Sequence, residues 1–239
     1  MLVTVALVVA GAGLALAARL ARPSAAPITG IVVDQPVPAV QLVGADGRAS
    51  SLAVFAGRVV VLAPFLTLCH DVCPITTGAF LAMERDVDAA GLADRVAFVE
   101  VTIDPGRDTP ARLRAYARLT GANWPLLTGS ASAIASFWRF FGVYYERAPE
   151  PSPAAVDWWT NQPEAYDVVH TNGLFFIGPH GRERALIQGG PNLDATLPPA
   201  LTGLLDAQGR QALTHPQGAW TVRQALDDLG LLLGRHIPG

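Results

Sequence analysis

This chain of 239 residues contains no lysine, and its Lys and Arg total of 17 consists entirely of arginine. Without lysine, the chain can form neither a lysine Schiff base nor the Gly-Lys-Ser/Thr loop that binds nucleotide phosphates. Cysteine occurs only twice, which excludes a four-cysteine zinc or iron–sulfur site within one chain and a scaffold of several disulfides. The 20 acidic side chains leave a net charge of −3, so the chain also lacks the strongly basic face that nucleic acid requires.

Apolar residues, in contrast, are abundant. Hydrophobic side chains make up 51% of the chain and charged side chains 15%, which excludes a disordered chain and suffices for the core of one domain. Two continuous apolar runs, residues 59–66 and 96–103, are typical of strands buried on both faces. Alternating segments of strand and helix character predict an α/β domain over residues 28–239, with helices on both faces of a sheet. We expect the other strands at residues 28–33, 38–43, 51–54, 168–177 and 185–187, and the helices at residues 75–90, 110–119, 131–141 and 222–233.

The N-terminal segment has a different character from the rest of the chain. Residues 2–18 carry no charge, and this run of 17 residues reaches the lower limit for a membrane span. We therefore expect a transmembrane anchor over residues 1–20 and a linker over residues 21–27. A cleaved signal peptide is the first alternative, because Ala15 and Ala17 have the small size that a cleavage site needs, and a buried helix is the second.

The two cysteines lie only four residues apart, directly after a predicted buried strand. Cys69 and Cys73 are followed by Pro74, which suits the first turn of a helix. A helix N-terminus stabilises thiolates, and residues four apart on a helical turn share one face, with Cα atoms about 6 Å apart. The pair can therefore form a disulfide or bind one soft metal ion. Two buried cysteines that act as small hydrophobic residues are the plainer alternative.

Five histidines are candidates for a third ligand, and two thiolates with one imidazole suit Cu(I). His70 lies between the cysteines and could approach a metal or face solvent. His170 is a candidate ligand because its predicted strand could approach the cysteine loop, although a lone histidine more often has a structural role. His180 lies in a turn, and His215 and His236 lie in irregular or terminal segments, so we expect these three at the surface.

Three motifs together resemble the Sco/SenC family of membrane-tethered proteins with a thioredoxin-like fold. The first is C-x-x-x-C-P at residues 69–74, after an apolar strand. The second is D-P-x-x-D-T-P at residues 104–110, and the third is the aspartate–histidine segment at residues 166–171. The resemblance covers about residues 30–190.

This resemblance implies that Cys69, Cys73 and His170 bind copper, and that the cysteines form a redox-active dithiol. It further implies a metallochaperone rather than an enzyme, which helps assemble the copper centre of cytochrome c oxidase. Its partners would be the copper-accepting oxidase subunit, a thiol reductant and the membrane, with the domain on the extracytoplasmic side of a bacterial cell membrane. Three features depart from the family pattern. Val169 directly precedes the histidine, where the family usually has aspartate, and His70 stands where the family often has proline. The stretches at residues 147–165 and 190–219 are longer than is usual in the family.

A thiol–disulfide oxidoreductase that reduces partner cysteines is the competing function, and the need for His170 distinguishes the two. A thiol peroxidase is disfavoured, because residues 66–69 (LTLC) lack the T-x-x-C arrangement. Asp104 and Asp108 are interpreted as the end of a strand and the start of a helix rather than as an acidic metal site. For Trp158 and Trp159, we favour packing over a loop against docking on a partner or membrane.

Overall fold

The computed structural model describes residues 28–150, 152–193, 196–215 and 217–238. The predicted anchor at residues 1–20 and the predicted linker at residues 21–27 lie outside this part of the chain. Among the described residues, no helix combines the length and the apolar character needed to cross a membrane.

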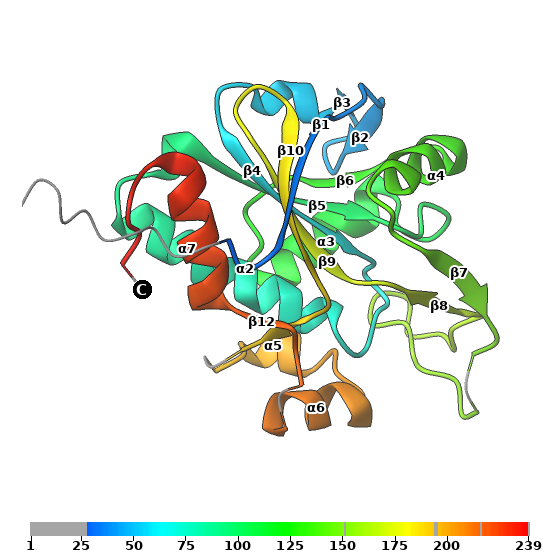
Figure 1. Cartoon of the computed structure of the whole chain (residues 1–239). Coiled ribbons are helices and arrows are strands. Elements are labelled where there is room, and N and C mark those ends of the chain that lie inside the picture. The colour runs from blue at the N-terminus through cyan, green and yellow to red at the C-terminus, as the bar shows by residue number, and fades with distance from the viewer. Residues whose placement is uncertain (1–27, 151, 194–195, 216, 239) are drawn as a thin grey trace, which may run out of the picture.

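An eight-stranded mixed sheet forms the centre of the domain (Figure 1). Its middle strands, β4 (Val59–Phe65) and β5 (Val96–Thr102), run parallel, and every residue of both is buried. The burial of both faces confirms the expectation from their apolar runs. The strand order is β1-β10-β9-β4-β5-β6-β2-β3, and the remaining members are β1 (Ile31–Pro36), β2 (Leu42–Gly44), β3 (Ala49–Ser50), β6 (Leu126–Thr128), β9 (Gly173–Ile177) and β10 (Arg182–Gln188).

Helices cover both faces of this sheet, as predicted. The crossovers from β4 to β5 and from β5 to β6 advance in one direction, which places α2 (Cys73–Ala89) and α3 (Pro110–Thr120) on one face. The last helix, α7 (Val222–Leu233), packs against α2 on that face. α4 (Ala131–Phe140), in the connection from β6 to β9, covers the other face, where its Trp138 packs against Phe175 of β9.

The single strand predicted at residues 168–177 is wrong, because this segment is divided between two sheets. β8 (Asp167–His170) pairs with β7 (Tyr145–Ala148) in a separate two-stranded sheet, whereas β9 continues into the central sheet. Thr171 still donates its N–H to the carbonyl of Tyr144, and the next carbonyl, of Asn172, accepts from Gly189. The exchange of partners thus occurs between adjacent residues, where β-branched and aromatic residues favour strand on both sides.

Short helices and strands form two further stretches, residues 51–54 and the described part of residues 189–219. The strand predicted at residues 51–54 is wrong: it is the short helix η1 (Leu52–Phe55), because β3 ends after two residues. The stretch at residues 189–219 lacks a clear pattern, and its described part contains short elements in the lower part of Figure 1, close to the start of α2. These are β11 (Pro191–Asn192), α5 (Pro199–Thr202) and α6 (Ala207–Thr214). β12 (Trp220–Thr221) follows this stretch and pairs with β11, and a second short helix, η2 (Ala93–Arg95), precedes β5.

Candidate metal centre

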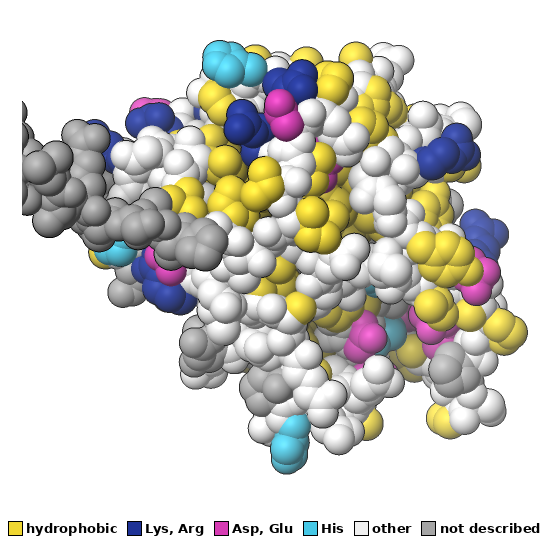
Figure 2. Space-filling model, in the orientation of Figure 1, with side chains coloured by type: hydrophobic (Ala, Val, Ile, Leu, Met, Phe, Trp, Pro, Cys, Tyr) yellow, Lys and Arg dark blue, Asp and Glu magenta, His cyan; other side chains and the backbone are white. Residues whose placement is uncertain are grey.

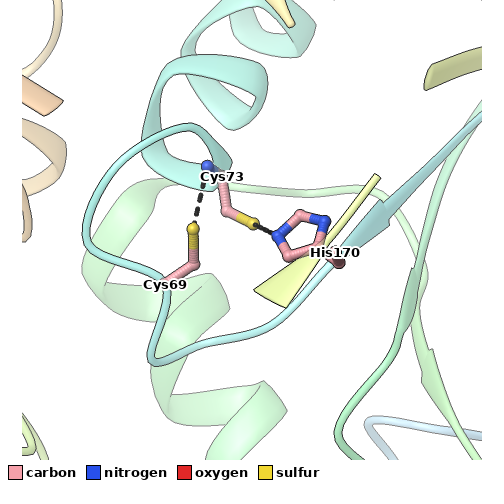
Figure 3. A group of neighbouring side chains, drawn as sticks. All are labelled: Cys69, Cys73 and His170. Carbon is pink, nitrogen blue, oxygen red and sulfur yellow. Dashed lines mark hydrogen bonds between the residues drawn. The ribbon is translucent and has the colours of Figure 1, made fainter. Parts of the chain in front are cut away.

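Cys69, Cys73 and His170 meet at the end of the sheet where β4 leads into α2 (Figure 3). Cys69 lies in the loop after β4, Cys73 is the first residue of α2, and His170 is the last residue of β8. Their ligand atoms all lie within 4.8 Å of one another. The Sγ atom of Cys73 is 3.7 Å from Nε2 of His170, although the two residues are 97 positions apart in the sequence. The structure therefore brings together the three residues that the sequence singled out.

The two thiols differ in exposure and in acidity. Cys69 is 8% exposed and Cys73 is 1% exposed, and neither forms a disulfide. Burial raises the pKa of the Cys73 thiol well above its ordinary value, and the neighbouring Cys69 sulfur adds to this rise. Burial also opposes ionisation of Cys69, but hydrogen bonds from Cys73 and His170 outweigh it and lower its pKa to about 7. The backbone N–H of Cys73, at the start of α2, donates to the Cys69 sulfur over 3.3 Å. Cys69 is therefore the thiol that ionises first.

His170 is oriented by a backbone contact. Its Nδ1 atom lies 3.2 Å from the carbonyl of Thr171, so Nε2 faces the sulfur atoms. A proton on Nδ1 leaves the Nε2 lone pair free for a metal. Burial lowers the pKa of this imidazole, but the hydrogen bond with Cys69 and the Thr171 carbonyl more than compensate, and the net pKa is raised. Val169, which precedes His170, is 50% exposed and offers no side-chain acceptor, so the acceptor for Nδ1 is the Thr171 carbonyl.

The other histidines do not join this cluster. Both ring nitrogens of His70 have partners: Nδ1 lies 2.8 Å from the carbonyl of Leu204, and Nε2 lies 2.6 Å from Oε1 of Glu164. The hydrogen bond with Glu164 raises the pKa of His70 to about 9, although partial burial opposes this rise. His70 is thus neither a solvated side chain nor a free ligand. The three remaining histidines are exposed, as predicted: His180, His215 and His236.

The aspartates of the D-P-x-x-D-T-P motif have structural partners. Asp108 accepts hydrogen bonds from the hydroxyls of Thr67 and Thr102, both over 2.5 Å, and burial raises its pKa to about 6. Because Thr67 lies in the loop that leads to Cys69, Asp108 anchors that loop. Thr109 caps α3, which confirms the predicted start of this helix, and Asp104 bonds to Arg107. Neither aspartate belongs to the group of metal-ligand candidates among the described residues.

The tandem tryptophans also support the loop. The indole N–H of Trp158 donates to the carbonyl of Thr67 over 2.8 Å, and its ring packs against Tyr116. Trp159 stacks on Trp158, lies beside the Arg112 guanidinium and remains 45% exposed. The expectation of packing over a loop is therefore confirmed for Trp158. The sequence did not reveal Thr67 or Glu164 as supports of this loop, because neither is part of a recognisable pattern.

A hollow of about 530 Å³ opens onto Cys69 and His170. Four carboxylates line it together with His70, two amide side chains and several apolar side chains, and no arginine does among its described lining residues. Figure 2 shows acidic side chains beside a histidine on the lower right of this face. Carboxylates therefore outnumber cationic side chains along the approach to Cys69. The carboxylates belong to Asp71, Glu150, Asp167 and Asp206.

The chain is similar to known proteins in both sequence and fold. A family model described as SCO1/SenC matches residues 34–198, more than half of the chain. The chain is 30% identical to the mitochondrial SCO2 homolog of Bos taurus over 135 residues, which cover 56% of this chain and 47% of the relative. It is 28% identical to a putative copper-binding protein of Stutzerimonas stutzeri, with 67% of this chain and 73% of the relative covered. The chain thus spans about half the length of the mitochondrial relative.

Among solved structures, the chain is similar to Bradyrhizobium japonicum ScoI with copper bound. The TM-score is 0.54 at 24% identity, and the match covers 71% of this chain and 97% of that structure. At this identity, the similarity establishes a shared fold.

Proposed function

Because the chain belongs to the SCO1/SenC family, we propose that it is a copper metallochaperone that helps assemble the copper centre of cytochrome c oxidase. It binds one copper ion through Cys69, Cys73 and His170 and passes it to the copper-accepting oxidase subunit. The observation that carries this proposal is the approach of two sulfur atoms and one imidazole nitrogen to within 4.8 Å of one another. The similarity to the putative copper-binding protein of Stutzerimonas stutzeri supports the same metal.

The donor atoms suit copper for a chemical reason. Thiolate sulfur is a soft ligand that selects Cu(I), and imidazole nitrogen serves both Cu(I) and Cu(II). A set of two thiolates and one imidazole can therefore hold copper in either oxidation state. Burial of Cys69 and Cys73 shields the bound ion from water on the side of α2.

Loading and release follow from the chemistry of the thiols. Both must be reduced, and each loses its proton as it binds copper, so Cys69, with its pKa of about 7, offers the first thiolate. Oxidation of the two thiols to a disulfide removes two electrons and two protons, which the disulfide of a thiol partner can take up. The disulfide lacks thiolate ligands, so oxidation couples redox state to loss of copper.

We test this proposal by metal analysis of the full chain after reduction, after oxidation and in a Cys69→Ser variant. The reduced protein should hold one copper per chain, and the other two forms should hold almost none, because a hydroxyl is a poor ligand for Cu(I). His180→Ala is the matched control, since it removes an exposed histidine from a turn. Retention of a full copper equivalent by the oxidised protein refutes ligation by sulfur.

We further propose that residues 1–20 anchor the chain in a bacterial membrane, residues 21–27 form a linker, and residues 28–239 form a thioredoxin-like domain outside the cytoplasm. The apolar run and the disulfide-capable cysteine pair support this location, because disulfides persist in oxidising compartments. A reporter that is active only in the cytoplasm, fused at the C-terminus, should be inactive. An active fusion contradicts this topology.

A thiol–disulfide oxidoreductase remains the second candidate, and the difference between the two thiols favours it. Cys69 has a pKa of about 7 and lies beside a helix N-terminus, which are properties of an attacking thiol. Such a reductase needs no imidazole from β8. Replacement of His170 therefore separates the two functions.

A further inference from the structure

His170 reaches the cysteines from a strand outside the central sheet. β8 is hydrogen-bonded to β7 alone in a two-stranded sheet, whereas Cys69 and Cys73 follow directly from β4. The ladder between β7 and β8 aligns these two strands with each other but does not attach them to the cysteine loop. The C-terminal end of β8 continues into β9, which pairs with β4, so this end is tied to the central sheet. The N-terminal end of β8 has no such pairing, and other contacts must hold it in place.

A buried chain of ionic hydrogen bonds connects this N-terminal end to the cysteine loop. It starts at His70, the residue after Cys69. The Nε2 atom of His70 lies 2.6 Å from Oε1 of Glu164. The other carboxylate oxygen of Glu164 accepts from Nη1 of Arg107 over 3.1 Å. The same Nη1 donates to the carbonyl of Tyr166 over 2.7 Å, and Tyr166 directly precedes β8.

Further contacts hold the arginine in place. Its Nε bonds to Asp104 over 2.5 Å, and the hydroxyl of Tyr166 donates to the same carboxylate over 3.0 Å. The Arg107 guanidinium also lies 3.9 Å from the centre of the Tyr166 ring. The side chain of Glu164 is 2% exposed and that of Arg107 14%. Since charges at such burial are unfavourable without partners, the members of the chain depend on one another.

We propose that His70, Glu164 and Arg107 form a clasp that positions His170 against Cys69. The clasp joins the residue after Cys69 to the residue before β8, and so connects the two segments that supply the ligands. His70 also attaches the loop to residues 204–206, because it bonds to the carbonyl of Leu204 and its own carbonyl accepts from Asp206. These three are positioning residues that do not touch the metal. The role in metal binding rests on the proposed function, whereas the mechanical link does not.

The first experiment measures copper in the full-length protein with Glu164→Ala. We expect Cu(I) affinity to fall about tenfold, at the lower end of the loss seen when groups that orient a metal ligand are removed. In the Cu(II) form, the nitrogen hyperfine signal of the imidazole should weaken in electron paramagnetic resonance spectra. Glu164→Gln keeps the shape and one acceptor oxygen, so it should retain more of both properties.

The matched control is Asp157→Asn. Asp157 forms an equally buried ion pair with Arg112 over 2.6 Å, and it lies in the same β7–β8 connection. It has no hydrogen bond to His70 or Tyr166 among the contacts of the described residues. Asp157→Asn should therefore leave the affinity and the nitrogen signal unchanged. Equal losses in both variants would overturn the proposal, because any buried ion pair would then serve.

The second experiment needs no metal. In the reduced, metal-free protein, amide hydrogens of residues 167–170 should exchange faster in Glu164→Ala than in wild type, and at the wild-type rate in Asp157→Asn. Unchanged exchange in Glu164→Ala overturns the clasp even if copper binding changes. If wild type binds no copper, the proposed function fails, while this experiment still decides the clasp. Should Glu164→Ala not fold, His70→Gln breaks the same contact at the more exposed end, where the side chain is 20% exposed.

Discussion

His70 and His170 both lie close to Cys69, yet their surroundings give them different chemistry. His170 directs Nε2 at sulfur and binds only a backbone carbonyl through its other nitrogen. His70 directs Nε2 at the carboxylate of Glu164 and has no nitrogen left for a metal. An imidazole beside a thiolate loop is therefore a candidate ligand only when the fold leaves one of its nitrogens unpaired. Proximity to Cys69 in the sequence favours His70 as the metal ligand, whereas the contacts in the structure favour His170.

The largest expected effect compares the two histidines directly. His170→Ala should weaken Cu(I) binding about a hundredfold or more, because it removes a proposed ligand. His70→Ala should weaken it at most about tenfold, because it disturbs only the position of the loop. Competition with a chromophoric Cu(I) chelator measures both values. If His70→Ala loses as much affinity as His170→Ala, the wrong imidazole has been assigned.

The same His170→Ala variant separates the chaperone from the reductase. Its dithiol should still form and exchange a disulfide, because that chemistry uses only Cys69 and Cys73. In cells, the variant should fail to support oxidase assembly at low copper and recover in part when copper is added. Full assembly with His170→Ala, combined with none in the Cys→Ser variants, would instead favour the reductase. Oxidase activity of membranes, with and without added copper, provides the measurement.

A smaller effect concerns the two thiols. At pH 7 about half of Cys69 should be thiolate, whereas Cys73 should be almost entirely protonated, since its pKa lies well above the ordinary value. Iodoacetamide should therefore label Cys69 more than tenfold faster than Cys73 in the metal-free reduced protein. The rate at Cys69 should rise with pH and level off above about pH 8. Peptide mapping by mass spectrometry at a series of pH values tests this, and equal labelling at pH 7 contradicts it.

The smallest expected effect is the contribution of His70 to stability. Its pKa is raised from 6.5 to about 9 in the folded state, so the folded protein binds the proton more tightly than the unfolded chain. This contribution is complete below pH 6.5 and is lost as the pH rises through 9. After allowance for partial exposure, we expect about 1 kcal/mol in the free energy of unfolding. Urea unfolding measures the free energy of unfolding at pH 6 and at pH 9.5. The difference between these two values should be smaller for His70→Gln than for wild type. An identical difference in both proteins would refute the raised pKa of His70.

The sequence allowed the central architecture to be predicted, because the relevant signals are local. Continuous apolar runs identified β4 and β5, Thr109 and Pro110 marked the start of α3, and the final helix at residues 222–233 matched α7. The division of residues 168–177 between two sheets escaped prediction. Strand propensity reports that a segment is extended and does not report which neighbour it pairs with.

The candidate site shows the same division between local features, which the sequence predicts, and long-range contacts, which it does not. The sequence by itself determined that Cys69 and Cys73 lie close together where a buried strand leads into a helix, because their spacing and Pro74 act locally, although only Cys73 is part of the helix. Only the tertiary structure decided that His170 meets them from 97 residues away while His70, next to Cys69, turns to Glu164. Partners distant in the chain are selected by packing and by the requirement that buried polar groups be satisfied. That requirement depends on the assembled fold, and no local pattern of residues expresses it.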